Sequence, residues 1–169
     1  GLLRPRKGSI SWGGVDVTRR PTHARAKAGI AHCQEGRKLF AGLTVAENLR
    51  LGAFGAHRAD IAAREAEVHQ IFPILAERAG QIATTMSGGQ QQMLAIGRAL
   101  MSRPRLLLCD EVTLGLSPKV ADEIYSALAR VADEGTALLL VDQDAERCLA
   151  AARRAYVLER GRVRWQGKA

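Results

Sequence analysis

Aromatic side chains are scarce in this sequence, where Phe, Trp and Tyr together make up 4% of the residues. Proteins that bind single-stranded nucleic acids stack bases on aromatic side chains, so this shortage disfavours that class. The net charge of +8 would by itself permit a nucleic-acid or anionic-membrane partner. The basic residues, however, are mostly arginines spread along the whole chain, which favours a solvated basic surface over a nucleic-acid site.

Cysteine is rare and long apolar runs are absent. The three cysteines are widely spaced and form no CxxC pair, and the four histidines show no metal-ligand spacing. These counts disfavour a disulfide framework and a zinc site, so we expect free thiols in a reducing compartment. The longest apolar runs, around residues 106–109 and 137–141, are far shorter than the roughly 20 residues that span a bilayer. The sequence therefore predicts a cytosolic globular protein.

Strand-like and helix-like segments alternate along the chain. Apolar spacing predicts a hairpin over 8–18, a strand over 28–33, helices between 44 and about 78, a helix from 87, a strand over 105–110, a helix over 118–133, a strand over 136–142, a helix from about 145, and strands near 155–159 and 162–165. Strands that alternate with helices are typical of a parallel sheet. We therefore predict an α/β fold with a parallel sheet, an antiparallel hairpin and a helical insertion.

A Ser-Gly-Gly turn begins the helix that is predicted from residue 87. Ser87 is a suitable N-cap, and Gln90 stands three residues later, as in a capping box. Gly88 and Gly89 let a ligand approach the backbone, and the free N–H groups of a helix start favour a phosphate. Alone, such a turn is more often only a cap. The same helix contains two glutamines that we expect to face solvent, at positions 91 and 92.

Two adjacent carboxylates follow the apolar run LLLC. Asp110 and Glu111 are therefore expected at the carboxyl end of a buried strand, which is where ligands bind in open parallel sheets. One carboxylate can hold Mg²⁺ through its waters, and the next can orient a water for attack on phosphorus. Alone, an Asp-Glu pair is more often a solvated strand terminus. Its combination with the Ser-Gly-Gly helix favours a nucleotide site.

The stretch that carries these features resembles a known family. MSGGQQQMLAIGRALMSRPRLLLCDEVTLGLSP is similar to the signature motif, the following helix, the Walker B strand and the D-loop of ABC ATPases. CQEGRKLFAGLTVAENL resembles their Q-loop region, LLLVDQD their H-loop, and GLLRPRKGSISWGGVDVT the segment after their phosphate loop. Within the family, the Q-loop region, QQQMLAIGRALM and the Val-Asp-Gln-Asp segment are similar to the ATP-binding subunits of bacterial branched-chain amino acid importers.

The resemblance implies a role for each matching residue. Residues 87–90 match the signature, which in this family reaches the γ-phosphate of ATP held by the partner in a head-to-tail dimer. Asp110 matches the aspartate that supports Mg²⁺, and Glu111 matches the catalytic glutamate that polarises the attacking water. The D-loop, which links the two sites of the dimer, is matched by Leu114, Gly115 and Leu116.

Two positions depart from the family pattern. Glu35 occupies the place of the Q-loop glutamine, and Gln34 stands one place early. A glutamate occurs there in the amino acid importer branch, so Glu35 is the candidate Mg²⁺ and coupling residue and Gln34 its neighbour. The H-loop histidine is replaced by Gln143, which can hydrogen-bond a phosphate but cannot carry a proton as histidine does.

The third departure is the phosphate loop itself. No GxxxxGK[ST] motif occurs in these residues, although backbone N–H groups and a lysine of this loop normally hold the β and γ phosphates. We therefore expect a fragment of a longer ATPase rather than a naturally truncated protein. On this interpretation the full-length protein hydrolyses MgATP, whereas the fragment alone is inactive, exposes apolar surface and a sheet edge, and is poorly stable.

Taken together, residues 1–169 are predicted to form a partial ABC nucleotide-binding domain. Its helical subdomain would span about 44–86, and residues 87–169 would carry the signature helix, Walker B, D-loop and H-loop. The resemblance implies a second ATPase subunit, identical or paralogous, transmembrane permease subunits, an indirect link to a periplasmic binding protein, and a place on the inner face of the cell membrane. Branched-chain amino acids are the implied cargo, with related amides or urea as alternatives. Two other functions stay open: a non-transport ABC ATPase acting on nucleic acid or the ribosome, and a catalytically silent interaction module.

Overall fold

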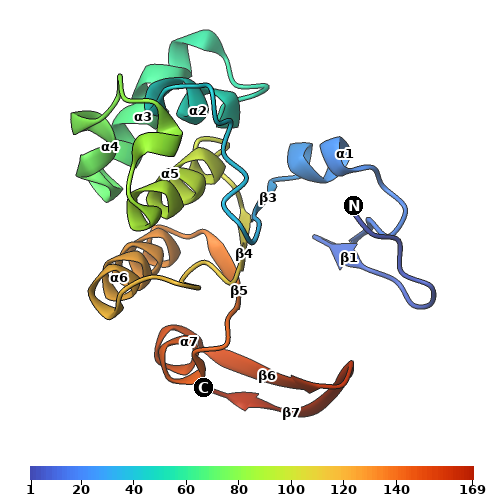
Figure 1. Cartoon of the computed structure of the whole chain (residues 1–169). Coiled ribbons are helices and arrows are strands. Elements are labelled where there is room, and N and C mark those ends of the chain that lie inside the picture. The colour runs from blue at the N-terminus through green and yellow to red at the C-terminus, as the bar shows by residue number, and fades with distance from the viewer.

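The computed structural model describes residues 1–169, in which helices pack on a small parallel sheet (Figure 1). In chain order the elements are β1 (Ser11–Trp12), β2 (Val15–Asp16), α1 (Thr22–Lys27), β3 (Ile30–Cys33), α2 (Val45–Gly52), α3 (Arg58–Ile71), α4 (Pro73–Glu77), the 3-10 helix η1 (Ala83–Thr85), α5 (Gly88–Leu100), β4 (Leu106–Asp110), α6 (Pro118–Asp133), β5 (Ala137–Val141), α7 (Ala145–Ala151), β6 (Arg154–Glu159) and β7 (Arg162–Lys168). The predicted α/β fold is confirmed, with its parallel sheet, antiparallel hairpin and helical insertion.

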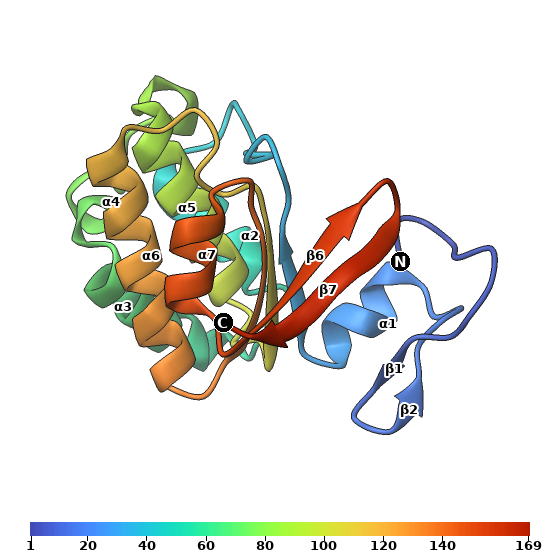
Figure 2. The same ribbon diagram turned by 90° about the horizontal axis from the view of Figure 1, so that it is seen from below.

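The parallel sheet has the strand order β3-β4-β5. Its register pairs Cys33 with Cys109 and Asp110 with Val141, so all three strands end at one edge. Helices α5 and α6 lie on one face of the sheet (Figures 1 and 2). On β4, Leu107 and Cys109 are buried, as expected for side chains that point toward these helices. The sheet therefore presents the residues that follow β3, β4 and β5 side by side.

One hydrophobic core joins this sheet to the helical insertion. Helices α2, α3 and α4 pack around α5, whose residues are buried on almost every side. The fully buried large side chains of the core include Leu49, Leu75, Leu94, Ile96, Leu107, Ile124 and Leu128. Burial of a side chain of this kind stabilises a fold by about 1.5–3 kcal/mol. No helix is long and apolar enough to cross a membrane.

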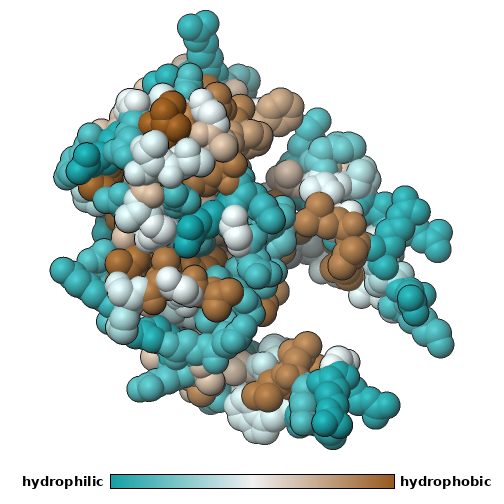
Figure 3. All heavy atoms as spheres, in the orientation of Figure 1, coloured by the Kyte–Doolittle hydropathy of each residue, from teal (hydrophilic) through white to brown (hydrophobic).

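The opposite face of the sheet is sparsely covered. The β1–β2 and β6–β7 hairpins and α1 extend on that side of β3–β5 (Figure 2). On β5, Leu139 and Val141 are 51% and 54% exposed. Apolar side chains also gather on the β6–β7 hairpin at the bottom of Figure 3, where Leu158 is 68% exposed. Exposed apolar surface, which the sequence predicts, is therefore present in the structure.

The prediction that Gln91 and Gln92 of α5 both face solvent is wrong. Gln92 is only 5% exposed, and its amide nitrogen donates to the Cys33 sulfur at 3.5 Å. The half-buried amide of Gln91 donates to the carbonyl oxygens of Thr84 at 3.2 Å and Met86 at 2.9 Å. Because α5 is enclosed by the sheet and by other helices, it has little free solvent face at this point.

Candidate functional site

Three loops meet where the parallel strands end. Gln34 and Glu35 follow β3, Glu111 follows β4, and Gln143 follows β5 after one residue. Because the strands are parallel and aligned, the carboxyl edge collects the predicted Q-loop, Walker B and H-loop residues. Local chemistry alone would not bring these segments together, since they are far apart in sequence.

The structure pairs the two residues predicted to be catalytic. The Gln143 amide nitrogen donates to the Glu111 carboxylate at 2.8 Å. Glu111 itself leaves the strand in the left-handed region, with φ of +47°, while its N–H donates to the Val141 carbonyl at 2.7 Å. A non-glycine residue in this conformation is uncommon and is often found at functional sites. The contact orients the carboxylate through a neutral donor that does not exchange a proton near neutral pH.

The predicted metal-binding carboxylates lie at the same edge. Asp110 is the last residue of β4 and is half-buried, and Glu35 is exposed in the loop after β3. None of the five ion pairs of the structure involves Glu35, Asp110 or Glu111. The chain contains no cluster of three or more His, Cys, Asp or Glu side chains that could hold a metal by themselves. One or two uncompensated carboxylates fit Mg²⁺, which usually keeps waters and phosphate oxygens as its other ligands.

The signature-like residues form the predicted helix start. The Ser87 hydroxyl accepts from the Gln90 N–H at 3.3 Å, and the Gln90 side chain accepts from the Ser87 N–H at 3.1 Å. A Cβ on Gly88 would lie 3.1 Å from the guanidinium of Arg37, and a Cβ on Gly89 would lie 2.5 Å from the Val120 side chain. Gly89 therefore permits close packing of α5 against α6. Residue 88 lies beside the cationic loop that follows β3.

No hydrogen bond or ion pair joins residues 87–90 to Asp110 or Glu111. The D-loop-like residues occupy the turn after Glu111, where Leu114 is 53% exposed, Gly115 has φ of +72° and Leu116 is half-buried. The structure therefore groups Glu35, Asp110, Glu111 and Gln143 at the edge of the sheet, whereas the signature-like turn contacts Arg37 of the loop after β3.

Sequence reasoning missed the residue that shapes the loop after β3. The Arg98 guanidinium donates to the carbonyl oxygens of Arg37 at 3.2 Å and Lys38 at 2.8 Å and lies 5.3 Å from the Phe40 ring centroid. Arg37 and Lys38 both have positive φ, at 63° and 47°. Burial lowers the pKa of Arg98 from its ordinary value. The signal was an arginine in a helix otherwise rich in apolar residues.

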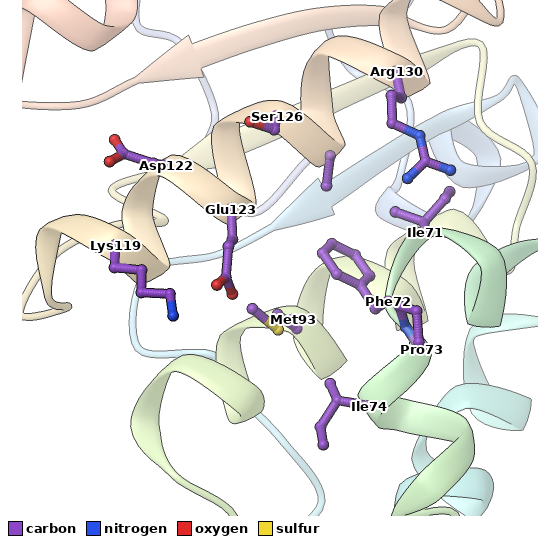
Figure 4. A pocket seen from close by; sticks show the side chains of 11 residues that line it. Ile71, Phe72, Pro73, Ile74, Met93, Lys119, Asp122, Glu123, Ser126 and Arg130 are labelled. Carbon is purple, nitrogen blue, oxygen red and sulfur yellow. The ribbon is translucent and has the colours of Figure 1, made fainter.

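A separate groove of about 710 Å³ lies between α6, the α3–α4 junction and α5 (Figure 4). Phe72, Ile74 and Met93 supply apolar surface, and Lys119 and Glu123 are charged residues at its side. The groove contains none of the predicted site residues, so the candidate site is the edge of the sheet.

Comparison with known proteins identifies the family. The sequence profile described as "ABC transporter" matches residues 1–114. The chain belongs to the ABC transporter family. It is 46% identical to the high-affinity branched-chain amino acid transport ATP-binding protein BraG of Pseudomonas aeruginosa over 156 residues, which are 92% of this chain and 67% of BraG. Its identity with the probable branched-chain amino acid transport ATP-binding protein LivF of Archaeoglobus fulgidus is 36% over 170 residues, 100% of this chain and 72% of LivF.

Solved structures of the family share the fold. The dimeric ATP-binding cassette MJ0796 bound to ADP and Pi matches with a TM-score of 0.86 at 24% identity, over 99% of this chain and 75% of that one. The resemblance to ABC ATPases that the motifs predict is therefore confirmed.

Proposed function

We propose that this chain is the ATP-binding subunit of an importer of branched-chain amino acids, and that its protein hydrolyses MgATP to drive uptake. The contact between Gln143 and Glu111 at the carboxyl edge of the sheet is the observation that carries the proposal. An oriented carboxylate at this edge supports the proposal, because α/β folds bind their ligands beyond the carboxyl ends of their strands. The relatives BraG and LivF, which are named as branched-chain amino acid transport ATP-binding proteins, support the choice of cargo.

The carboxylates have two proposed roles: two of them bind the metal, and the third orients the attacking water. Asp110 and Glu35 would hold Mg²⁺, in part through its waters, because neither is neutralised by a Lys or Arg side chain of the chain. When bound, Mg²⁺ neutralises charge on the phosphate oxygens. Glu111 orients the attacking water. Gln143 holds the Glu111 carboxylate in place through a hydrogen bond and transfers no proton.

The signature-like turn is assigned to a second subunit's nucleotide. Ser87, Gly88, Gly89 and Gln90 open a 13-residue helix, so free N–H groups and the positive helix end are available to a phosphate that approaches from outside. We propose a dimer, of two identical or two paralogous chains, in which this turn faces the partner's ATP and Leu114, Gly115 and Leu116 lie between the two sites. The dimeric form of MJ0796 supports the choice of a dimer.

Transport requires further protein partners, which the chain would contact at the membrane. We propose transmembrane permease subunits, with the chain on the inner face of the cell membrane and a periplasmic binding protein that acts through the permease. Residues 1–169 contain no GxxxxGK[ST] motif, so the groups that grip the β and γ phosphates in this family are not supplied by such a loop within them. Tests of activity therefore use the complete protein that its gene encodes.

The decisive experiment replaces Glu111 with glutamine in the complete protein, reconstituted with its permease in liposomes. We expect ATP binding to be retained and hydrolysis to fall by about a hundredfold or more, because only the water-orienting carboxylate is lost. Leucine uptake supplied by the binding protein should fall in parallel. Glu123, an exposed carboxylate on α6, provides the matched control.

Glu123→Gln should leave both rates unchanged, since this residue lies at the groove and not at the edge of the sheet. Turnover that survives Glu111→Gln would remove Glu111 from the mechanism. If hydrolysis drives the uptake of an amide or urea but not of leucine, only the proposed cargo is wrong.

A further inference from the structure

A second contact joins the loops that carry Glu111 and Gln143. The Thr113 hydroxyl donates to the Asp142 carboxylate at 2.7 Å. Thr113 lies two residues after Glu111, and Asp142 lies one residue before Gln143. The same two loops are thus linked twice, once through Asp142 and once through Gln143. Thr113 and Asp142 lie within the Walker B and H-loop stretches, but the sequence assigns a role to neither of them.

The Asp142 carboxylate is held from several sides. One of its oxygens accepts from Thr113 and from the Tyr125 hydroxyl of α6, the latter at 3.3 Å. Its other oxygen accepts from the Asp144 N–H at 3.1 Å, next to the start of α7. Tyr125 is only 8% exposed, and burial raises its pKa, so its hydroxyl remains a donor at neutral pH. The loop after β5 is therefore fixed to α6 and to the loop after β4.

Gln143 needs such a support because its own surroundings are open. Its side chain is exposed, and a glutamine side chain loses rotamer freedom when it is held in one conformation. An exposed amide that makes one hydrogen bond to a carboxylate would alternate between this contact and water. Fixing the backbone at residue 142 limits where the Gln143 amide can reach.

We propose that Asp142, clamped by Thr113 and Tyr125, is a positioning residue that keeps Gln143 against Glu111. This inference rests on the proposed function, because its consequence is the rate at which Glu111 activates water. Asp142 itself does not touch the reacting atoms. It acts through the loop that it immobilises.

The test uses Thr113→Val, which keeps the shape of the side chain and removes its donor, in the complete protein. We expect kcat for ATP hydrolysis to fall about tenfold with an unchanged KM, and Thr113→Ser to restore it, because serine returns the hydroxyl. Thr136→Val is the matched control, since the Thr136 hydroxyl also donates a hydrogen bond, to the Pro104 carbonyl at 3.1 Å, at the opposite end of the sheet. This variant should keep the wild-type kcat.

A double substitution separates positioning from general stability. In a Gln143→Ala background, Thr113→Val should lower kcat by less than about twofold, because the amide that the clamp positions is already gone. A full tenfold loss in that background would overturn the inference. A failure of Thr113→Ser to restore kcat would overturn it too.

A nuclear magnetic resonance measurement tests the clamp without turnover. The Gln143 side-chain amide signal, assigned by its loss in Gln143→Ala, should exchange its protons with water at least about threefold faster in Thr113→Val than in wild type or Thr136→Val. Equal exchange in all three proteins would overturn the inference even if the protein hydrolyses ATP. If wild type hydrolyses no ATP but the exchange rates differ as expected, the proposed function fails and the clamp stands.

Discussion

Replacing Asn48 with aspartate should destabilise the folded protein by about 3 kcal/mol or more at neutral pH. Asn48 is fully buried in α2, the first helix of the insertion. Its side-chain oxygen accepts from the Phe40 N–H at 3.0 Å. Its nitrogen donates to the carbonyl oxygens of Phe40 at 3.1 Å, Leu43 at 3.3 Å and Thr44 at 3.0 Å. One side chain thus organises the loop that leads from the carboxyl edge of the sheet into α2.

The magnitude follows from what aspartate can and cannot do at this position. Its shape is the same, but an ionised carboxylate has no donor and would face three carbonyl oxygens. Removal of one partner from a buried hydrogen bond costs about 1–3 kcal/mol, and an unpaired buried charge costs about 3–5 kcal/mol. Protonation relieves part of this cost, because the neutral acid donates one hydrogen bond. The pKa of the introduced acid in the folded state is therefore raised above its unfolded value of about 3.9, and stability falls as the pH rises above about 4.

Urea unfolding at pH 7 and at pH 4.5 measures both the cost and its sign. We expect a lower midpoint for Asn48→Asp than for wild type at pH 7 and a smaller difference at pH 4.5. The control is Gln166→Glu, the same amide-to-acid change at an exposed position of β7, which should shift neither midpoint appreciably. Equal midpoints for Asn48→Asp and wild type at pH 7 would refute the assignment of Asn48 as an essential donor.

Three further outcomes follow from burial. A Cβ on Gly52 would lie 1.8 Å from the Arg98 carbonyl oxygen, so Gly52→Ala should lower the free energy of unfolding, measured in urea, by about 3 kcal/mol. The control is Gly80→Ala, because no atom lies within 4 Å of the added carbon, and it should change this free energy by less than about 0.5 kcal/mol. Burial raises the pKa of Cys33 to about 11, so iodoacetamide at pH 8 should label the half-buried Cys148 and spare Cys33, as mass spectrometry of the folded protein can show. Because the folded pKa of Cys33 lies above its unfolded value, this thiol makes the fold less stable as the pH rises from about 9 to 11, and the urea midpoint should fall over that range.

Local chemistry made several elements predictable from the sequence. The capping box of Ser87 and Gln90 fixes the start of α5, and α6 has the predicted bounds of Pro118 and Asp133. Both depend on residues within a few positions of each other. Burial depends on distant segments instead: Gln92 was expected in solvent because the helix pattern does not reveal that β3 brings the Cys33 sulfur beside it. The tertiary packing of α5 therefore had to come from the structure.

The candidate site divides in the same way. The motifs predict which residues matter, but the hydrogen bond between Gln143 and Glu111 arises only when β4 and β5 pair with Asp110 opposite Val141. The clamp at Asp142 needs the same register and also the side chain of Tyr125 from α6. A sequence pattern does not predict that three segments distant in the chain contact the same carboxylate. The catalytic, metal-binding and signature assignments stay predictions.

The distribution of charge supports the hypothesis that the carboxyl edge of the sheet binds a cation and phosphates. The chain has an excess of eight positive charges, yet Glu35, Asp110 and Glu111 at this edge form no ion pair with any of its Lys or Arg side chains. Arginines pair elsewhere with surface carboxylates, as Arg103 does with Glu67. Neighbouring carboxylates that lack cationic partners repel one another, so selection for stability alone would favour a basic residue among them. A site that must admit Mg²⁺ has the opposite requirement, because a lysine or arginine there would compete with the metal for the same oxygens.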